Sequence, residues 1–231
     1  MKTSCRYTHI FLELKDICKS YRDGSEERVI LDGVSLAVGK GEFAAIVGPS
    51  GSGKSTFLSV AGLLLTPDSG SVLIGGKDVT GASKGERTMI RRRQLGLIFQ
   101  SHKLLPYLKT ADQLAIVQEK PMRKKVSTDE LLSELDIADC RDKFPAKMSG
   151  GEKQRAAIAR AFVNDPDVIP ADEPTASLDA QRGRFAVEMI RNEVKKRNKA
   201  AVMVTHDNHV LDLVDSVYRI DGGKLLKERF E

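Results

Sequence analysis

The chain has 231 residues, enough for one large domain or for one domain with a small appendage. Hydrophobic residues make up 41% and charged residues 30%, as in soluble globular proteins, and no apolar run approaches the ~18 residues that span a bilayer. The net charge is only +5, tryptophan is absent and aromatic residues make up 5%, which disfavours a nucleic-acid surface with stacking aromatics. Cys5, Cys18 and Cys140 lack metal-site spacing and fit a reducing compartment.

The first third of the chain predicts a hairpin, a buried strand and a helix. Residues 10–21 and 29–38 alternate apolar and polar side chains, as half-buried strands do, with Asp23-Gly24-Ser25 as a turn between them. Residues 43–47 are almost wholly apolar, as expected for a parallel strand covered on both faces. A helix is predicted to follow over 54–65.

Strands and helices alternate through the remainder. The further strands are predicted at 71–75, 95–99, 167–172 and 200–205, and the further helices at 84–93, 149–164 and 178–198. Between the two halves of the sheet, residues 110–144 have a helical pattern in which Ser127 or Thr128 is the expected N-cap. This alternation predicts an α/β fold with a mainly parallel sheet and a helical insertion.

A glycine-rich loop follows the apolar strand. Residues 48–56 match GxxxxGK[ST] between that strand and a helix, which is the context of a phosphate-binding loop. Glycines let the backbone approach the phosphate oxygens, Lys54 can reach the β- and γ-phosphates, and the Ser55 hydroxyl can ligate Mg²⁺. The residues expected to contact the nucleotide here are Gly48, Pro49, Ser50, Gly51, Ser52, Gly53, Lys54, Ser55 and Thr56.

Polar side chains end three of the later strands. Asp172 is placed to hold Mg²⁺ through water, and Glu173 to activate an attacking water as general base. His206 could donate to the transferring phosphate, and the Gln100 amide could complete the Mg²⁺ shell or orient water. Alone, an acidic pair at a strand end is more often a cap or a surface pair. After a phosphate-binding loop, a catalytic role is favoured.

A second anion site is predicted where Ser149, Gly150 and Gly151 open a helix, because exposed N–H groups and the helix dipole both favour an anion. This segment lies beyond the helical insertion, so one nucleotide cannot readily occupy both sites in one chain. The simplest solution is a head-to-tail dimer in which this helix terminus covers the nucleotide of the other chain.

Together these motifs resemble the ATPase of an ATP-binding cassette (ABC) transporter over residues 11–226. They occur in family order: Tyr21 for adenine stacking, 48–56 for the Walker A loop, Gln100 for the Q-loop, 148–152 for the signature, 168–173 for Walker B, Ser177-Leu178-Asp179 for the D-loop and His206 for the switch. The resemblance implies four nucleotide-binding residues in the signature, acting across a dimer interface, and one in the D-loop: Ser149, Gly150, Gly151, Glu152 and Asp179.

The same resemblance implies the fold and the function. The fold would be a single nucleotide-binding domain over 1–231 with a RecA-like parallel-sheet core, an antiparallel β subdomain and a helical subdomain at about 101–163. The protein would be an ATPase that uses ATP and Mg²⁺, pairs with itself or a paralogue, and drives an integral-membrane permease from the cytoplasmic face of the membrane. It looks most like the lipoprotein-release and macrolide-export branch. The alternative is a nucleotide-switched regulator of the cell-division type; a soluble ABC ATPase of translation or DNA maintenance is disfavoured by the chain length.

Several positions depart from the family pattern, namely Pro170, Lys109, Met148 and Glu152-Lys153. Pro170 is the departure with a structural consequence. Pro170 lies inside the predicted Walker B strand, where a proline removes a hydrogen-bond donor. We expect a local bulge or weakened pairing there, which could displace Asp172 and Glu173 and slow turnover.

Overall fold

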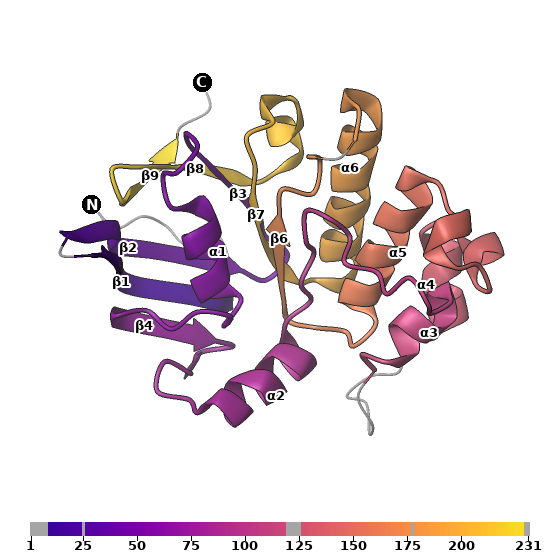
Figure 1. Ribbon diagram of the computed structural model, residues 1–231, viewed down its shortest axis with the longest axis horizontal. Coiled ribbons are helices and arrows are strands. Elements are labelled where there is room, and N and C mark those ends of the chain that lie inside the picture. The colour runs from indigo at the N-terminus through magenta and orange to yellow at the C-terminus, as the bar shows by residue number, and fades with distance from the viewer. Residues whose placement is uncertain (1–8, 25, 119–125, 177, 229–231) are drawn as a thin grey trace.

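The computed structural model describes residues 9–24, 26–118, 126–176 and 178–228. Cys5, Ser25 of the predicted turn and Ser177 of the predicted D-loop lie outside these residues. The described chain forms two sheets, each with helices packed against it. The helices at 110–115 and 128–134 lie beyond one edge of the parallel sheet (Figure 1).

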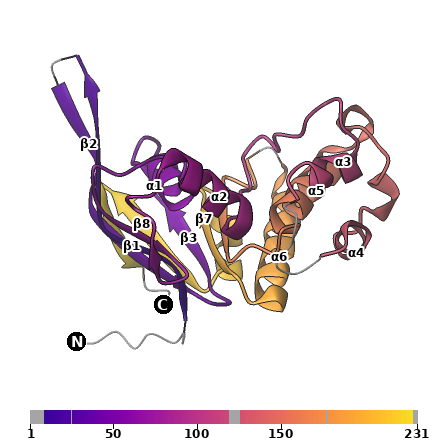
Figure 2. The same ribbon diagram turned by 90° about the horizontal axis from the view of Figure 1, so that it is seen from below.

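The first sheet is antiparallel, in the order β2-β1-β4-β5. Its first two strands pair as a long hairpin, as the alternating pattern predicted, and the end of this hairpin projects away from the rest of the chain (Figure 2). The strands are β1 (Ile10–Asp23), β2 (Glu26–Gly39), β4 (Ser69–Ile74) and β5 (Lys77–Asp78).

The second sheet has the order β6-β7-β3-β8-β9, in which all pairs except β8 with β9 are parallel. The predicted parallel sheet is therefore confirmed. Its strands are β3 (Phe43–Val47), β6 (Val168–Asp172), β7 (Ala200–Val204), β8 (Ser216–Asp221) and β9 (Lys224–Glu228).

Alternate residues of β3 enter two different cores, which explains why this strand is apolar throughout. Ala44 and Ile46 pack with α1 and the antiparallel sheet, whereas Ala45 and Val47 pack on the other face with α5 and α6. The helices are α1 (Lys54–Ala61), α2 (Lys84–Gln94), α3 (Thr110–Ala115), α4 (Thr128–Glu134), α5 (Gly150–Phe162) and α6 (Ala180–Arg197).

Several predicted helix boundaries need correction. The helix expected over 54–65 ends at Ala61, because Gly62 and then Leu63, with φ 55, turn the chain. Asp179 caps α6 by accepting from Arg182 N at 2.9 Å, so that helix begins two residues later than predicted. Ser127 is the N-cap of α4, although its side chain makes no capping hydrogen bond.

The strand predicted at 95–99 is wrong as a strand. Only two isolated bridges join this segment to β6, between Leu95 and Val168 and between Ile98 and Ala171. The segment nevertheless passes close to α5, since a Cβ on Gly96 would lie 2.2 Å from the carbonyl oxygen of Ala161.

Pro170 explains why the pairing between the segment at 95–99 and β6 is incomplete. Gly96 N donates to Val168 O at 2.9 Å, Ile98 N donates to Pro170 O at 3.0 Å, and Asp172 N donates to Ile98 O at 2.9 Å. The proline nitrogen therefore faces the same segment, where its missing hydrogen removes one bond. On its other side β6 pairs with β7 in unbroken register. The expected bulge is absent, and the weakened pairing lies on the side away from β7.

We expect Pro170→Ala to change little. The new N–H could add a hydrogen bond of ~1 kcal/mol, but the unfolded chain gains ~0.4–1 kcal/mol of conformational freedom when proline is lost. These terms nearly cancel, and the β7 pairing continues to position Asp172. Thermal unfolding and ATPase assays should agree with wild type within a few degrees and about twofold. A large gain in turnover would mean that the proline does displace the acidic residues.

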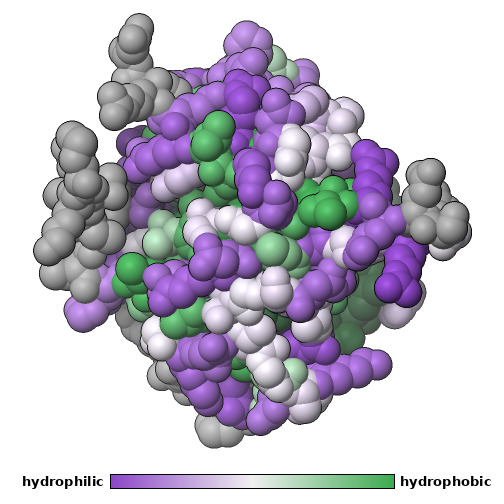
Figure 3. Space-filling view, turned by 90° about the vertical axis from the view of Figure 1, so that its left-hand side faces the viewer, coloured by the Kyte–Doolittle hydropathy of each residue, from purple (hydrophilic) through white to green (hydrophobic). Residues whose placement is uncertain are grey.

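No helix in the described ranges is both long and apolar enough to cross a membrane. On the side of the molecule with the antiparallel sheet, hydrophobic residues form small separate groups among hydrophilic ones (Figure 3).

Candidate active site

A cavity of about 500 Å³ lies where the phosphate-binding loop, the ends of the parallel strands and the hairpin meet. Parallel sheets place ligands at the carboxyl ends of their strands, and the cavity occupies this position. It is lined by Tyr21, Arg28, Ile30, Ser50, Gly51, Gly53, Lys54, Ser55, Thr56, Gln100, Asp172, Glu173 and His206. Eleven of these thirteen residues were predicted from the sequence; Arg28 and Ile30 were not.

The loop after β3 has the geometry of an anion cradle. A Cβ on Gly48 would lie 2.3 Å from Ile220 O, and one on Gly53 would lie 2.9 Å from Ile30 O, so glycine is required at both positions. Lys54 Nζ donates to the carbonyl oxygens of Gly48 and Pro49, at 2.7 and 2.8 Å. An ammonium held this way lies within the loop, ready to pair with phosphate oxygens.

The Ser52 hydroxyl belongs to the same loop but does not line the cavity. Its hydroxyl oxygen is buried and has no hydrogen-bond partner within the described residues. The fit of the loop to the polyphosphate for which the sequence predicts it therefore rests on the close approaches at Gly48 and Gly53 and on the Lys54 ammonium.

Glu173 lies directly after β6 in a left-handed conformation, with φ 43. Its backbone N–H donates to Val204 O at 3.0 Å, and its Oε2 is 2.8 Å from His206 Nδ1 and accepts from His206 N at 3.3 Å. Residues strained in this way often occur at functional sites. The structure thus brings together the two residues predicted as general base and phosphate sensor, which are 33 positions apart.

Asp172 is half-buried beside Glu173, and burial, followed by the neighbouring carboxylate charge, raises its pKa. Together with the Ser55 hydroxyl and the Gln100 amide it offers oxygen ligands, which suit Mg²⁺. The described residues contain no group of three or more His, Cys, Asp or Glu side chains that could hold a metal ion. Mg²⁺ usually binds through one or two protein oxygens, phosphates and water.

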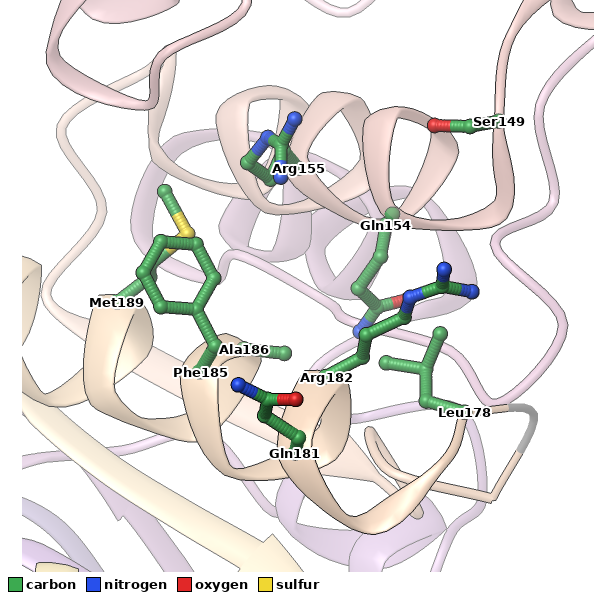
Figure 4. Close-up of a pocket in the computed structure, with 10 residues that line it drawn as sticks. Ser149, Gln154, Arg155, Leu178, Gln181, Arg182, Phe185, Ala186 and Met189 are labelled. Carbon is green, nitrogen blue, oxygen red and sulfur yellow. The ribbon is translucent and has the colours of Figure 1, made fainter.

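A second cavity, of about 380 Å³, lies between the N-terminal turns of α5 and α6, and shares no lining residue with the first. Gly151 of α5 lines it. So do Ser149, the N-cap of α5, Arg182 of α6, and Leu178, which precedes α6 (Figure 4). Gln154 extends between the two helices and donates to Pro174 O at 3.0 Å, which connects α5 to the segment after β6. The two predicted anion sites are thus separate within one chain.

The N-terminus of α5 is closed by a capping box. Glu152 N donates to Ser149 Oγ at 3.2 Å, and Ser149 N donates to Glu152 Oε2 at 2.6 Å. The other carboxylate oxygen accepts from Cys140 Sγ at 2.9 Å and from Lys143 Nζ at 3.1 Å. These contacts, the Cys140 thiol first, lower the Glu152 pKa to about 2. Both carboxylate oxygens of Glu152 are therefore used within the chain.

This network predicts a pH-dependent contribution to stability. Because the folded-state pKa of Glu152 is below its ordinary value, the folded chain binds fewer protons, so the contribution is present above about pH 4.5 and is lost as pH falls toward 2. Glu152→Gln should lower the free energy of unfolding by about 1–2 kcal/mol at pH 7. The loss should be smaller at pH 3.5, as measured by urea unfolding. Glu86→Gln, in the capping box of α2, is the matched control. A Glu152→Gln difference that does not change with pH would contradict this account.

The remaining predicted residues have other positions. Gly48, Pro49 and Ser52 belong to the loop without lining the first cavity, and Gly150 and Glu152 lie beside the second. The Asp179 carboxylate caps α6 and lies 3.3 Å from Arg182. Arg28 was missed because it lies just before the predicted strand at 29–38, and the register that places it directly opposite Tyr21 is set by the pairing of β1 with β2.

Comparisons with known proteins agree with this geometry. The family model described as ABC transporter matches residues 31–176. The putative hemin import ATP-binding protein HrtA of Staphylococcus haemolyticus (strain JCSC1435) is 42% identical over 218 residues, which are 93% of this chain and 98% of that protein. Its counterpart in Staphylococcus aureus (strain MRSA252) is 43% identical over 219 residues, with the same shares.

Solved structures show the same fold. A dimeric post-hydrolysis state of the ATP-binding cassette MJ0796, bound to ADP and Pi, has a TM-score of 0.83 and 32% identity, and covers 95% of this chain and 100% of its own. The cbiO1 structure from Clostridium perfringens has a TM-score of 0.82 and 27% identity, with 94% and 87% covered. The fold and the phosphate site therefore define an ATP-binding cassette.

The chain belongs to the ABC transporter family. It is the ATP-binding subunit of a transporter, and its enzymatic activity is the hydrolysis of ATP.

Proposed function

We propose that two copies of this chain, or one copy and a paralogue, enclose two ATP molecules head to tail. The observation that carries this is the separation of the two cavities: each chain has one phosphate cradle and, elsewhere, the helix terminus that would cover the partner's nucleotide. Two solved structures of the cassette MJ0796, which has the same fold, are dimeric. In our proposal the chain is a single domain over 1–231, and about 101–163 form its helical subdomain.

In each site Tyr21 stacks on adenine, and the loop at 48–56 holds the phosphates. Glu173 accepts a proton from the attacking water, and His206 and Gln100 respond to the γ-phosphate. Ser149, Gly150 and Gly151 complete the site from the partner chain, with Glu152 holding the helix terminus and Asp179 at the interface. Positioning and electrostatics then supply most of the catalysis, as is general for phosphoryl transfer.

Mg²⁺ is the metal we propose for the site, held by Ser55, Gln100 and Asp172. Their oxygen atoms suit a hard cation, and the rest of its shell would come from phosphate and water. When bound, Mg²⁺ neutralises charge on the β- and γ-phosphates.

A membrane permease is the proposed partner, which would place the chain on the cytoplasmic face of the membrane. A third cavity, of about 580 Å³, is a suitable docking position because it lies beside the Q-loop segment, between the core and α3. Its lining includes apolar Leu97, Phe99 and Ile116 and basic Arg92 and Arg160. An amphipathic segment with an acidic side chain would match this surface.

The transport direction and substrate remain separate proposals. Our first choice is export or lipoprotein release, on the family resemblance. The names of the HrtA relatives refer to hemin import, which makes hemin the second substrate class to test.

Affinity purification of Glu173→Gln from detergent-solubilised membranes of the native host tests these proposals. The variant is captured with MgATP and, as the control, without nucleotide. A co-eluting membrane protein with few spans and a large external domain would support export or release, and a many-span permease would support an importer. Stimulation of the purified wild-type complex by hemin would favour the hemin alternative. A soluble ATP dimer with no membrane protein would contradict the transport proposals.

A further inference from the structure

Arg28 is an unassigned basic residue in the nucleotide cavity. It is paired directly with Tyr21 across the hairpin of β1 and β2, so both side chains project from the same face of the sheet. Both residues line the cavity. The platform predicted for adenine therefore has a guanidinium group beside it.

The position along β2 indicates which part of the nucleotide this group meets. Ile30 adjoins the phosphate loop, because a Cβ on Gly53 would lie 2.9 Å from Ile30 O. Arg28 lies two residues further toward the hairpin end, about 7 Å away at the rise of a strand. The guanidinium is thus on the Tyr21 side of the cavity, away from the phosphate loop.

The guanidinium of Arg28 is free to contact a ligand, whereas the ammonium of the neighbouring Lys19 is held in an ion pair. Lys19 lies 5.7 Å from the centre of the Tyr21 ring, but its ammonium pairs with Asp68 at 2.5 Å and its side chain is only 14% exposed. Arg28 is exposed, and in the described part of the chain no carboxylate pairs with it. A free planar cation beside an aromatic ring is suited to an adenine face and to ribose oxygens.

We propose that Arg28 is a further nucleotide-binding residue, which contacts the adenine–ribose end of ATP from its position beside Tyr21. The proposal rests on the ATP site described above. In this proposal Arg28 contacts the base and ribose, whereas Lys54 contacts the phosphates. Since the base and ribose do not change during hydrolysis, Arg28 binds the ground state and the transition state equally, and its loss should affect KM and not kcat.

The experiment uses the full chain with a fluorescent ATP analogue, displaced by unlabelled ATP or ADP, together with steady-state ATPase assays. We expect Arg28→Ala to weaken the binding of both ATP and ADP by about tenfold, which is the effect of losing one cation–π or charge-assisted contact. KM should rise by the same factor with kcat unchanged, and Arg28→Lys should retain part of the affinity.

Arg22→Ala is the matched control. Arg22 and Glu27 form the next cross-strand pair along the hairpin, and Arg22 does not line the cavity. If Arg28→Ala binds ATP as tightly as Arg22→Ala, the proposal is wrong. A loss confined to ATP, or a fall in kcat at constant KM, would place the group at the γ-phosphate and overturn the assignment to the base and ribose. Wild-type protein that bound neither nucleotide would instead refute the ATP site itself.

Discussion

Glu173→Gln should reduce ATP hydrolysis by about 10²–10³-fold and leave ATP binding intact. Loss of a positioned general base has an effect of this size, and glutamine keeps the shape of the side chain and an oxygen that can accept from His206. Because the closed state would no longer be released by hydrolysis, the variant should accumulate as an ATP-bound dimer. Steady-state phosphate release and size-exclusion chromatography with light scattering measure the two effects.

The control for this variant is Glu188→Gln, which makes the same chemical change on the exposed surface of α6, where the side chain is 41% exposed and pairs with Arg184 at 3.3 Å. It should hydrolyse ATP at the wild-type rate and should not be trapped. A Glu173→Gln protein that turns over normally would exclude Glu173 as the base. One that binds ATP and remains monomeric would count against the head-to-tail dimer.

Ser149→Ala should lower the ATPase rate by about 10²-fold, the lower end of the effect of losing one preorganised donor, and weaken ATP-dependent dimerisation. The change removes the hydroxyl that lines the second cavity and the acceptor that caps α5 through Glu152 N. Removal of one preorganised polar group next to reacting phosphates has effects of this order, and the lost cap adds about 1 kcal/mol of destabilisation. ATPase assays and thermal unfolding measure the two contributions separately.

Ser83→Ala separates capping from catalysis within the same protein. Ser83 forms the same kind of capping box at the start of α2, with Glu86 N donating to its hydroxyl at 3.3 Å, and lines none of the three cavities described above. It should lower stability by a similar amount without affecting hydrolysis. Equal losses of activity in both variants would show that Ser149 acts only through stability.

Much of the candidate site can be predicted because its chemistry is encoded locally. The phosphate-binding loop is a run of consecutive residues whose glycines are required by close backbone approaches, as at Gly48. Glu173 and His206 each follow an apolar parallel strand, and the carboxyl ends of such strands meet at one edge of the sheet. Their contact at 2.8 Å could therefore be anticipated from two separate short motifs.

Features that depend on distant pairing could not be predicted in this way. The sequence cannot tell which side of β6 Pro170 faces, and this decides that the segment at 95–99 makes only isolated bridges. The partners of Glu152 at Cys140 and Lys143 come from the preceding helical region, with no periodic signal that connects them.

The amino-acid sequence by itself determined the family, most of the order of the strands and helices along the chain, and the candidate residues for holding and hydrolysing ATP. The tertiary structure decided the sheet order, the separation of the two predicted anion sites, and the position of Arg28 opposite Tyr21. The physical reason is the range of the interactions. Turns, caps and phosphate loops are set by neighbouring residues, whereas strand register and side-chain contacts across elements are set by packing between segments far apart in the chain.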